Sequence, residues 1–207
     1  MSEPRRFRML RSYTVADYFT LSNAAFGMAS VFICLNYVAA GSQKEVLWPV
    51  FLLLLLAAIC DLLDGFVARK LNSSSFLGED LDSLADVISF GVAPATLAYT
   101  LGMRGLWDAL ILVYFVLCGV SRLARFNATT DELKGEDGKV AYFEGTPIPT
   151  SLGLVIILFV AFVMGDTGNQ LWLGSFEVFG KTMHPLVIMF FLSGSAMISS
   201  NLRIPKP

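Results

Sequence analysis

Four aspartates follow a strongly apolar run in the first half of the chain. Residues 46–59 carry no charged side chain, yet Asp61 and Asp64 come directly after them, and Asp82 and Asp86 follow within a few helical turns. Carboxylates are costly to bury unless they are paired, hydrogen-bonded or bound to a cation. The pattern therefore indicates that something of opposite charge binds here.

Helical spacing gathers the side chains into two groups. On a helix that advances 100° per residue, two carboxylates and two small residues fall within about 100° of one another: Asp61, Asp64, Gly65 and Ala68. Asp82 and Asp86 are four residues apart and share a face of the next helix. The polar loop at residues 72–78 can reverse the chain, so we expect the two acidic faces to meet at the membrane boundary.

Four converging carboxylates would repel one another unless cations neutralise them, and two divalent cations would do so. Hard oxygen ligands favour magnesium, manganese or calcium over zinc. A pair of such ions assists displacement at phosphorus, because it stabilises both the attacking and the leaving oxygen. Gly65 and Ala68 would admit a phosphate chain or a nucleotide, and Arg69 could bind a phosphate. The alternative is that the aspartates are solvated or cap helix ends.

The composition indicates a membrane protein. Of the 207 residues, 55% are hydrophobic and only 15% are charged, whereas a soluble domain has about 25% charged residues. The one histidine, His184, lies far along the chain from the aspartates, which argues against a Ser-His-Asp or Cys-His enzyme and against a zinc site. The three cysteines lie in apolar runs and are expected to be small buried residues.

The elements that would position the aspartates are membrane spans of roughly 20 residues. We predict an all-α integral membrane protein with six transmembrane helices in a single domain, residues 1–207. The expected spans are about 16–39, 46–70, 80–102, 106–127, 149–165 and 184–202. Residues 1–15 contain four arginines and are expected to form a short interfacial helix rather than a signal peptide; a disordered basic tail is the alternative.

Lysine and arginine predict the orientation. With the N-terminus in the cytoplasm, only Lys44, Arg104 and Lys181 of the 15 basic residues fall on the opposite side. Both termini, the aspartates and the connection at 128–148 are therefore expected on the cytoplasmic side.

The spacing of the acidic stretch also carries a family resemblance. The pattern D-x2-D-G-x2-A-R-x8-G-x3-D-x3-D is similar to the signature of the CDP-alcohol phosphotransferases. It is filled here by Asp61, Asp64, Gly65, Ala68, Arg69, Gly78, Asp82 and Asp86. The resemblance implies a six-helix membrane enzyme, usually a homodimer, that cleaves the pyrophosphate of a CDP-linked donor and releases CMP.

The resemblance also implies roles for individual residues. Asp61, Asp64, Asp82 and Asp86 form the expected metal site. The first three would bind metal directly, and Asp86, adjacent to the metal, would be the general base. The expected CDP-lipid contacts combine the motif, a loop serine and the opening of the first span: Asp17, Thr20, Asn23, Asp61, Gly65, Ala68, Arg69, Ser75 and Gly78. The expected cofactors are two Mg²⁺ or Mn²⁺ ions.

Segments further along the chain bear on the acceptor. "SLADVISFGVAPA", "CGVSRLARFN", "YFEGTPIPT" and "MISSNLRIPKP" resemble the membrane-integral phosphatidylserine synthases within this family, especially fungal ones. This implies CDP-diacylglycerol and L-serine as substrates, a lipid bilayer as surroundings and an endoplasmic reticulum location, with no nucleic-acid partner. The fungal proteins carry a longer polar N-terminal segment than the few residues present here.

The expected serine site follows from charge. Arg122 and Arg125 suit the carboxylate of serine, Glu144 could meet its ammonium group, and Phe126 and Asn127 complete the matching segment. The two arginines could instead serve topology alone. Two alternatives stay open: another acceptor (inositol, glycerol phosphate or choline), or, from a different class, a cation transporter with carboxylates near mid-membrane.

Overall fold

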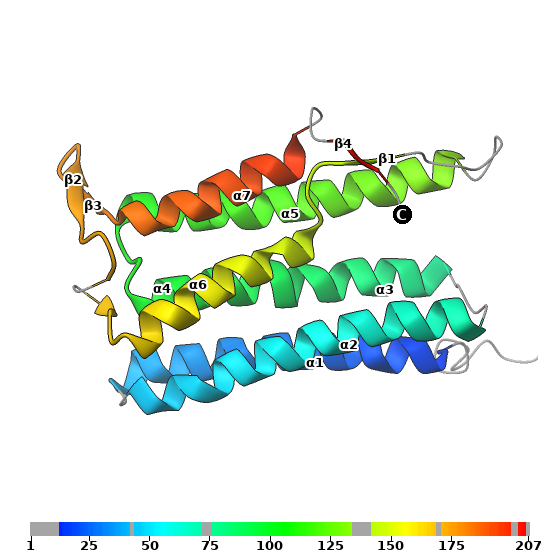
Figure 1. Ribbon diagram of the computed structural model, residues 1–207, viewed down its shortest axis with the longest axis horizontal. Coiled ribbons are helices and arrows are strands. Elements are labelled where there is room, and N and C mark those ends of the chain that lie inside the picture. The colour runs from blue at the N-terminus through cyan, green and yellow to red at the C-terminus, as the bar shows by residue number, and fades with distance from the viewer. Residues whose placement is uncertain are drawn as a thin grey trace, which may run out of the picture.

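The computed structural model describes residues 13–41, 44–71, 76–133, 142–168, 171–199 and 203–205. This part of the chain is mostly helical, with helices running along one axis (Figure 1). The α-helices are α1 (Val15–Ala40), α2 (Trp48–Leu71), α3 (Phe76–Asp86), α4 (Ala93–Leu101), α5 (Leu106–Leu133), α6 (Leu152–Val163) and α7 (Ile188–Ile198). The expected interfacial helix lies outside the described residues.

Four helical segments are long and apolar enough to cross a membrane: Val15–Ala40, Lys44–Leu71, Gly78–Leu101 and Leu106–Ala128. The two later spans expected from sequence correspond to shorter apolar helices, Ile148–Val163 and Pro185–Ile198. Leu52, Leu55 and Leu62 on α2 are more than half exposed, as expected of side chains that face lipid rather than a protein core.

The third expected span is not one continuous α-helix. Between α3 and α4 lies a π-helical segment, Val87–Val92, in which the Ala93 N–H donates to the carbonyl of Ile88, five residues earlier. Such wide turns are rare and frequently occur at functional sites. Here the turn begins directly after Asp86.

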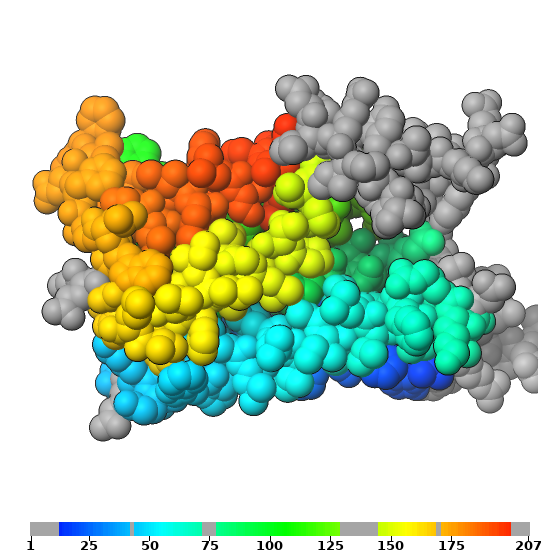
Figure 2. All heavy atoms as spheres, viewed as in Figure 1, coloured from blue at the N-terminus to red at the C-terminus, as the bar shows by residue number. Residues whose placement is uncertain are grey.

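Some helices approach each other closely at small residues, and others pack through aromatic side chains. A Cβ added at Gly194 of α7 would lie 3.2 Å from the Phe115 Cα of α5, the close backbone approach that small residues allow in membranes. Trp48 packs edge-on against Phe159 and Phe162 of α6. Figure 2 shows α6, in yellow, lying across the face of the bundle between α2 and α7.

The described residues also form two short antiparallel strand pairs beside the helices. β2 (Phe176–Val178) and β3 (Lys181–Met183) form an antiparallel hairpin at one end of the bundle, and Trp107 Nε1 donates to the Val178 carbonyl. β1 (Tyr142–Glu144) pairs with β4 (Arg203–Pro205). We call the end with the β2–β3 hairpin, on the left of Figure 1, the hairpin end, and the opposite end, where α1 begins and α2 ends, the motif end.

Candidate active site

Three carboxylates from two helices converge between α2 and α3. Asp61, Asp64 and Asp82 each offer an oxygen, and these oxygens all lie within 4.8 Å of one another. Asp64 is buried and the other two are half-buried. Oδ1 of Asp82 is buried without a hydrogen-bond partner among the described residues. Hard oxygens in this number, one of them unsatisfied, fit a magnesium or manganese ion.

The face of α2 predicted from spacing turns inward. Asp61, Gly65 and Ala68 are half-buried beside buried Asp64, whereas Leu62 is 71% exposed. Counted along the helix at 1.5 Å per residue, the two aspartates lie about 20–24 Å from Trp48. The two aspartates therefore lie in the half of α2 that is nearer the motif end.

Asp86 lies one turn beyond Asp82 and is only 7% exposed. Its Oδ1 accepts a long hydrogen bond of 3.5 Å from Nδ2 of Asn23. Its carboxyl group also interacts with those of Asp61 and Asp82, which carry the same charge. Asp86 is thus adjacent to the group formed by Asp61, Asp64 and Asp82 without belonging to it.

The polar residues that open α1 are buried, and two of them reach the aspartates. Thr20 Oγ1 donates to Asp64 Oδ2 at 2.8 Å, and Asn23 donates to Asp86. Asp17 instead accepts from the Thr14 backbone N–H at 2.6 Å, which caps the start of α1. In the described chain α1 therefore orients the acidic motif, beside any contact it makes with a nucleotide.

Gly65 and Arg69 form a small platform next to the aspartates. A Cβ built at Gly65 would lie 3.6 Å from Arg69 Nη1, so the guanidinium folds over the glycine. This places a phosphate-binding group one turn from Asp64. Gly78 lies in the first turn of α3, whereas Ser75, the expected loop contact, lies outside the described residues.

Of the residues expected to bind serine, Arg122 reaches the site. It is half-buried on α5, its charge interacts with Asp86, and its Nε is buried without a hydrogen-bond partner among the described residues. Arg125 and Phe126 are exposed. Glu144 lies in β1, and its side chain is outside the described part.

Asn127 has a different contact from the one expected. Its amide hydrogen-bonds to Ser83 in both directions, at 3.1 and 3.2 Å, and donates to Asp80 Oδ1 at 3.4 Å. It therefore ties α5 to α3 at the motif end. The sequence reasoning missed Asp80 and Ser83, although a polar pair at i, i+3 beside the acidic face was a usable signal.

Comparison with known proteins extends these observations. A family model described as CDP-alcohol phosphatidyltransferase matches residues 13–192. A protein of Saccharomyces cerevisiae named CDP-diacylglycerol–serine O-phosphatidyltransferase is 43% identical over 210 residues, which cover 100% of this chain and 75% of the yeast protein.

More distant relatives come from bacteria and archaea. The Helicobacter pylori protein of the same name is 33% identical and covers 94% of this chain and 73% of its own length. The archaetidylserine synthase of Methanothermobacter thermautotrophicus is 38% identical over 65% of this chain and 53% of that protein. The matched region contains the aspartate motif and the helices that hold it, and the chain belongs to the CDP-alcohol phosphatidyltransferase family.

Proposed function

We propose that this protein transfers the phosphatidyl group of CDP-diacylglycerol to L-serine, giving phosphatidylserine and CMP. The observation that carries the proposal is the convergence of Asp61, Asp64 and Asp82, with ligand oxygens within 4.8 Å. The names of the relatives support the substrates, since the yeast and bacterial proteins are named for serine and CDP-diacylglycerol.

The donor would bind against α2. Asp61, Asp64 and Asp82 would hold two Mg²⁺ or Mn²⁺ ions, which would neutralise the pyrophosphate and the charge that develops on leaving CMP. Arg69, folded over Gly65, would bind a phosphate by paired hydrogen bonds. The missing side chain of Gly65 leaves room for that phosphate beside the helix.

The acceptor would bind between α5 and Asp86. Arg122 interacts with Asp86, and its buried Nε has no hydrogen-bond partner among the described residues, so it would pair with the serine carboxylate. The serine hydroxyl oxygen attacks the phosphorus that carries diacylglycerol, and Asp86 takes the hydroxyl proton. A bond from serine oxygen to phosphorus forms, the pyrophosphate P–O bond breaks, and CMP leaves with the bonding electrons. Because a carboxylate is a weak base for a hydroxyl, positioning would supply much of the rate.

The remaining expectations belong to this proposal. The two shorter apolar helices would complete six spans in one domain, with both termini and the motif end in the cytoplasm. The chain would act as a homodimer in the endoplasmic reticulum membrane. The dimer rests on the family resemblance and the location on the likeness to fungal proteins, so both stay predictions.

The test is an acceptor panel. Purified protein with Mn²⁺ and CDP-diacylglycerol labelled in the cytidine is given serine, inositol, glycerol phosphate or choline in turn, and released CMP is counted. Serine alone should release CMP, with phosphatidylserine formed in equal amount. Release of CMP with another alcohol in place of serine would support the proposed reaction but show that serine is not the acceptor. Failure of all four to release CMP would contradict the proposed chemistry.

A further inference from the structure

The π-helical segment rotates the chain just beyond Asp86. Its i→i+5 bonding puts more residues into a turn than an α-helix has, so each residue advances less than 100°. In an unbroken α-helix, Ser89 would follow Asp82 at i+7 and share its face. In the structure Ser89 contacts α1 at Asn23, the residue whose side chain donates to Asp86.

Ser89 meets α1 at an unusually close approach. Its Oγ donates to the Asn23 carbonyl at 2.9 Å, and it is 1% exposed. A Cβ added at Gly27 would lie 2.9 Å from the Ser89 Cα. Real Cβ atoms do not approach so closely, and only glycine permits the contact. The depth at which α1 packs onto the π-helical segment is therefore fixed at this point.

Asn23 connects this contact to Asp86. Its backbone carbonyl receives the Ser89 hydroxyl, while its side-chain Nδ2 donates to Asp86 Oδ1 at 3.5 Å. The residue is fully buried. An amide donor on one carboxylate oxygen restricts rotation of the carboxyl group.

We propose that Asn23, held by the Ser89–Gly27 contact, is a positioning residue for Asp86 rather than a contact to the nucleotide. The inference rests on the proposed function, in which Asp86 accepts the acceptor proton. The π-helical segment would then direct Ser89 toward α1, while Asp86 stays on the same helix face as Asp82.

The test separates positioning from nucleotide binding. For wild type and Asn23→Ala, CMP release is measured over serine and donor concentrations, CDP-diacylglycerol binding is measured by calorimetry without serine, and Tm is recorded. We expect kcat to fall about 10- to 100-fold with donor affinity unchanged, while Tm falls because a buried amide partner is removed. Weaker donor binding with kcat kept, or no change in either, would overturn the proposal.

Matched serine variants test the connection. Ser89→Ala should lower kcat in the same direction by a smaller factor. Ser30→Ala is the control: Ser30 is equally buried, but its Oγ donates to the Gly27 carbonyl of its own helix. Equal kcat in Ser89→Ala and Ser30→Ala would show that Ser89 does not help to position Asn23. Should Asn23→Ala not fold, Asn23→Leu, which has a similar shape and no donor or charge, carries the same measurements and the same expected loss of kcat.

Asp86→Asn distinguishes this inference from the proposed function. If Asp86→Asn turns over normally, Asp86 is not the base and the proposed mechanism fails. If Asp86→Asn is inactive while Asn23→Ala behaves like wild type, the base assignment stands and the positioning role alone is overturned.

Discussion

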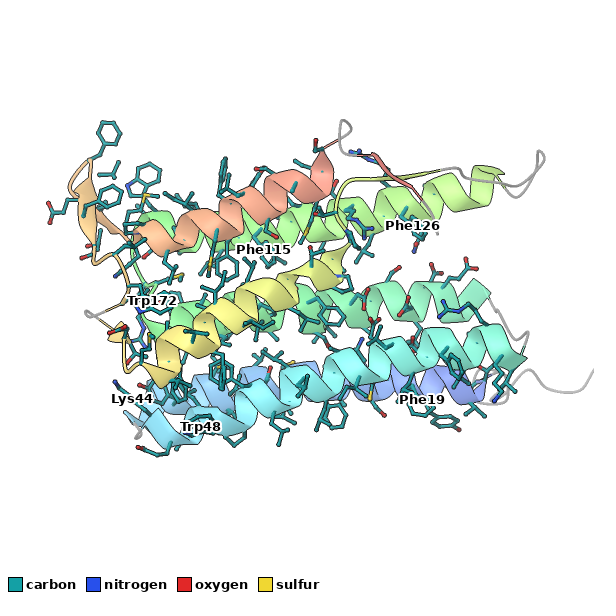
Figure 3. All side chains as sticks on the ribbon, in the orientation of Figure 1. Phe19, Lys44, Trp48, Phe115, Phe126 and Trp172 are labelled. Carbon is teal, nitrogen blue, oxygen red and sulfur yellow. The ribbon has the colours of Figure 1, made fainter. Side chains whose placement is uncertain are left out.

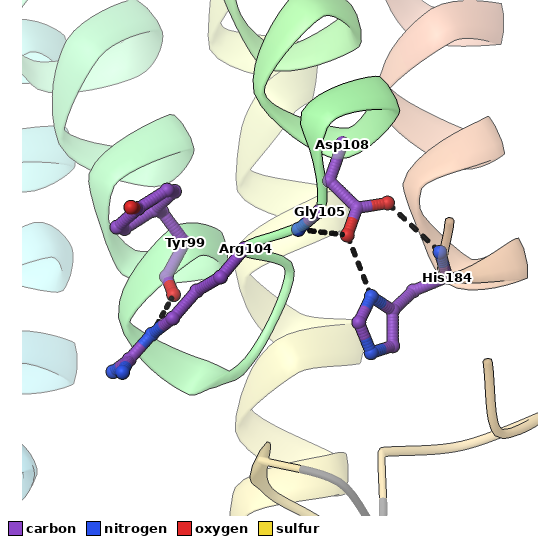
Figure 4. A network of polar contacts seen from close by, with 5 residues as sticks. All are labelled: Tyr99, Arg104, Gly105, Asp108 and His184. Carbon is purple, nitrogen blue, oxygen red and sulfur yellow. Dashed lines mark hydrogen bonds and ion pairs between the residues drawn. The ribbon is translucent and has the colours of Figure 1, made fainter. Parts of the chain in front are cut away.

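Buried carboxylates occur at both ends of the bundle, and they are satisfied very differently. At the hairpin end Asp108 is fully buried and accepts from the Gly105 N–H at 2.9 Å and the His184 N–H at 2.8 Å. His184 Nδ1 lies 2.6 Å from the same carboxylate (Figure 4). Three hydrogen-bond partners thus satisfy the Asp108 carboxylate. The contact with His184 joins the start of α5 to the segment that precedes α7.

At the motif end the carboxylates outnumber their partners. Asp82 keeps a buried oxygen without a hydrogen-bond partner in the described chain, and its neighbours are Asp61 and Asp64, groups of the same charge. Figure 3 shows the two ends on one view, with Lys44 and Trp48 near the hairpin end and Phe126 toward the motif end. Removing a partner from a fully paired buried charge is costly to the fold, whereas a buried carboxylate without partners calls for an explanation, and a bound cation would supply one.

The largest effect should come from the unsatisfied group. Asp82→Asn should lower CMP release by about a thousandfold, since charge stabilisation worth several kcal/mol is lost. The Tm of the cation-free protein should stay the same or rise, because one like charge leaves the cluster. A large loss of Tm without cation would mean that Asp82 has a structural role like that of Asp108.

Gly65→Ala should weaken the binding of the donor, CDP-diacylglycerol, without affecting the fold. The added methyl meets only the end of Arg69, at an ordinary 3.6 Å, so the Tm should not change. Overpacking against a bound phosphate costs about 1–3 kcal/mol, which should raise the KM for CDP-diacylglycerol about tenfold or more. Gly153→Ala is the control, since an added Cβ there meets nothing within 4 Å in the described structure. Equal kinetics for the two variants would show that no donor phosphate approaches Gly65.

Arg122→Lys should sharpen the assignment of the acceptor side. Replacing a guanidinium fork by a point charge should raise the KM for serine about tenfold and leave the KM for CDP-diacylglycerol close to wild type. Arg125→Lys should have a smaller effect, because Arg125 is exposed. Equal changes in both KM values for Arg122→Lys would contradict an acceptor role.

The smallest effect on catalysis should come from the satisfied carboxylate. Asp108→Asn replaces an acceptor oxygen by an amide donor next to two backbone N–H groups, which should cost about 1–3 kcal/mol of stability. The kcat of the folded protein should remain close to wild type. Thermal unfolding and CMP release measured on the same preparation separate the two quantities. A loss of kcat without a loss of Tm would show that Asp108 acts in catalysis, as the aspartates of the motif end are proposed to do.

Sequence spacing predicted the parts of the site that lie within one helix. Asp61, Asp64 and Gly65 share an inward face because a helix repeats every 3.6 residues, a property that any sequence displays directly. The family signature then related this face to Asp82. The apolar composition likewise indicated membrane helices.

Contacts between helices could not be read in the same way. His184 was judged isolated because its partner Asp108 is 76 residues away, and the Asn127–Ser83 bond spans 44 residues. The π-helical segment was also missed, because a single wide turn leaves no mark on an apolar stretch such as Val87–Val92. Such features depend on close packing, here at Gly27, rather than on local propensity.

Binding of Mn²⁺ tests the central claim most directly. Paramagnetic resonance of free Mn²⁺, titrated into purified protein without substrates, gives the number and affinity of bound ions for wild type, Asp82→Asn and Asp108→Asn. We expect wild type and Asp108→Asn to bind alike and Asp82→Asn to lose most of the affinity. Equal binding by all three proteins would contradict the claim that the carboxylates of the motif end form the cation site.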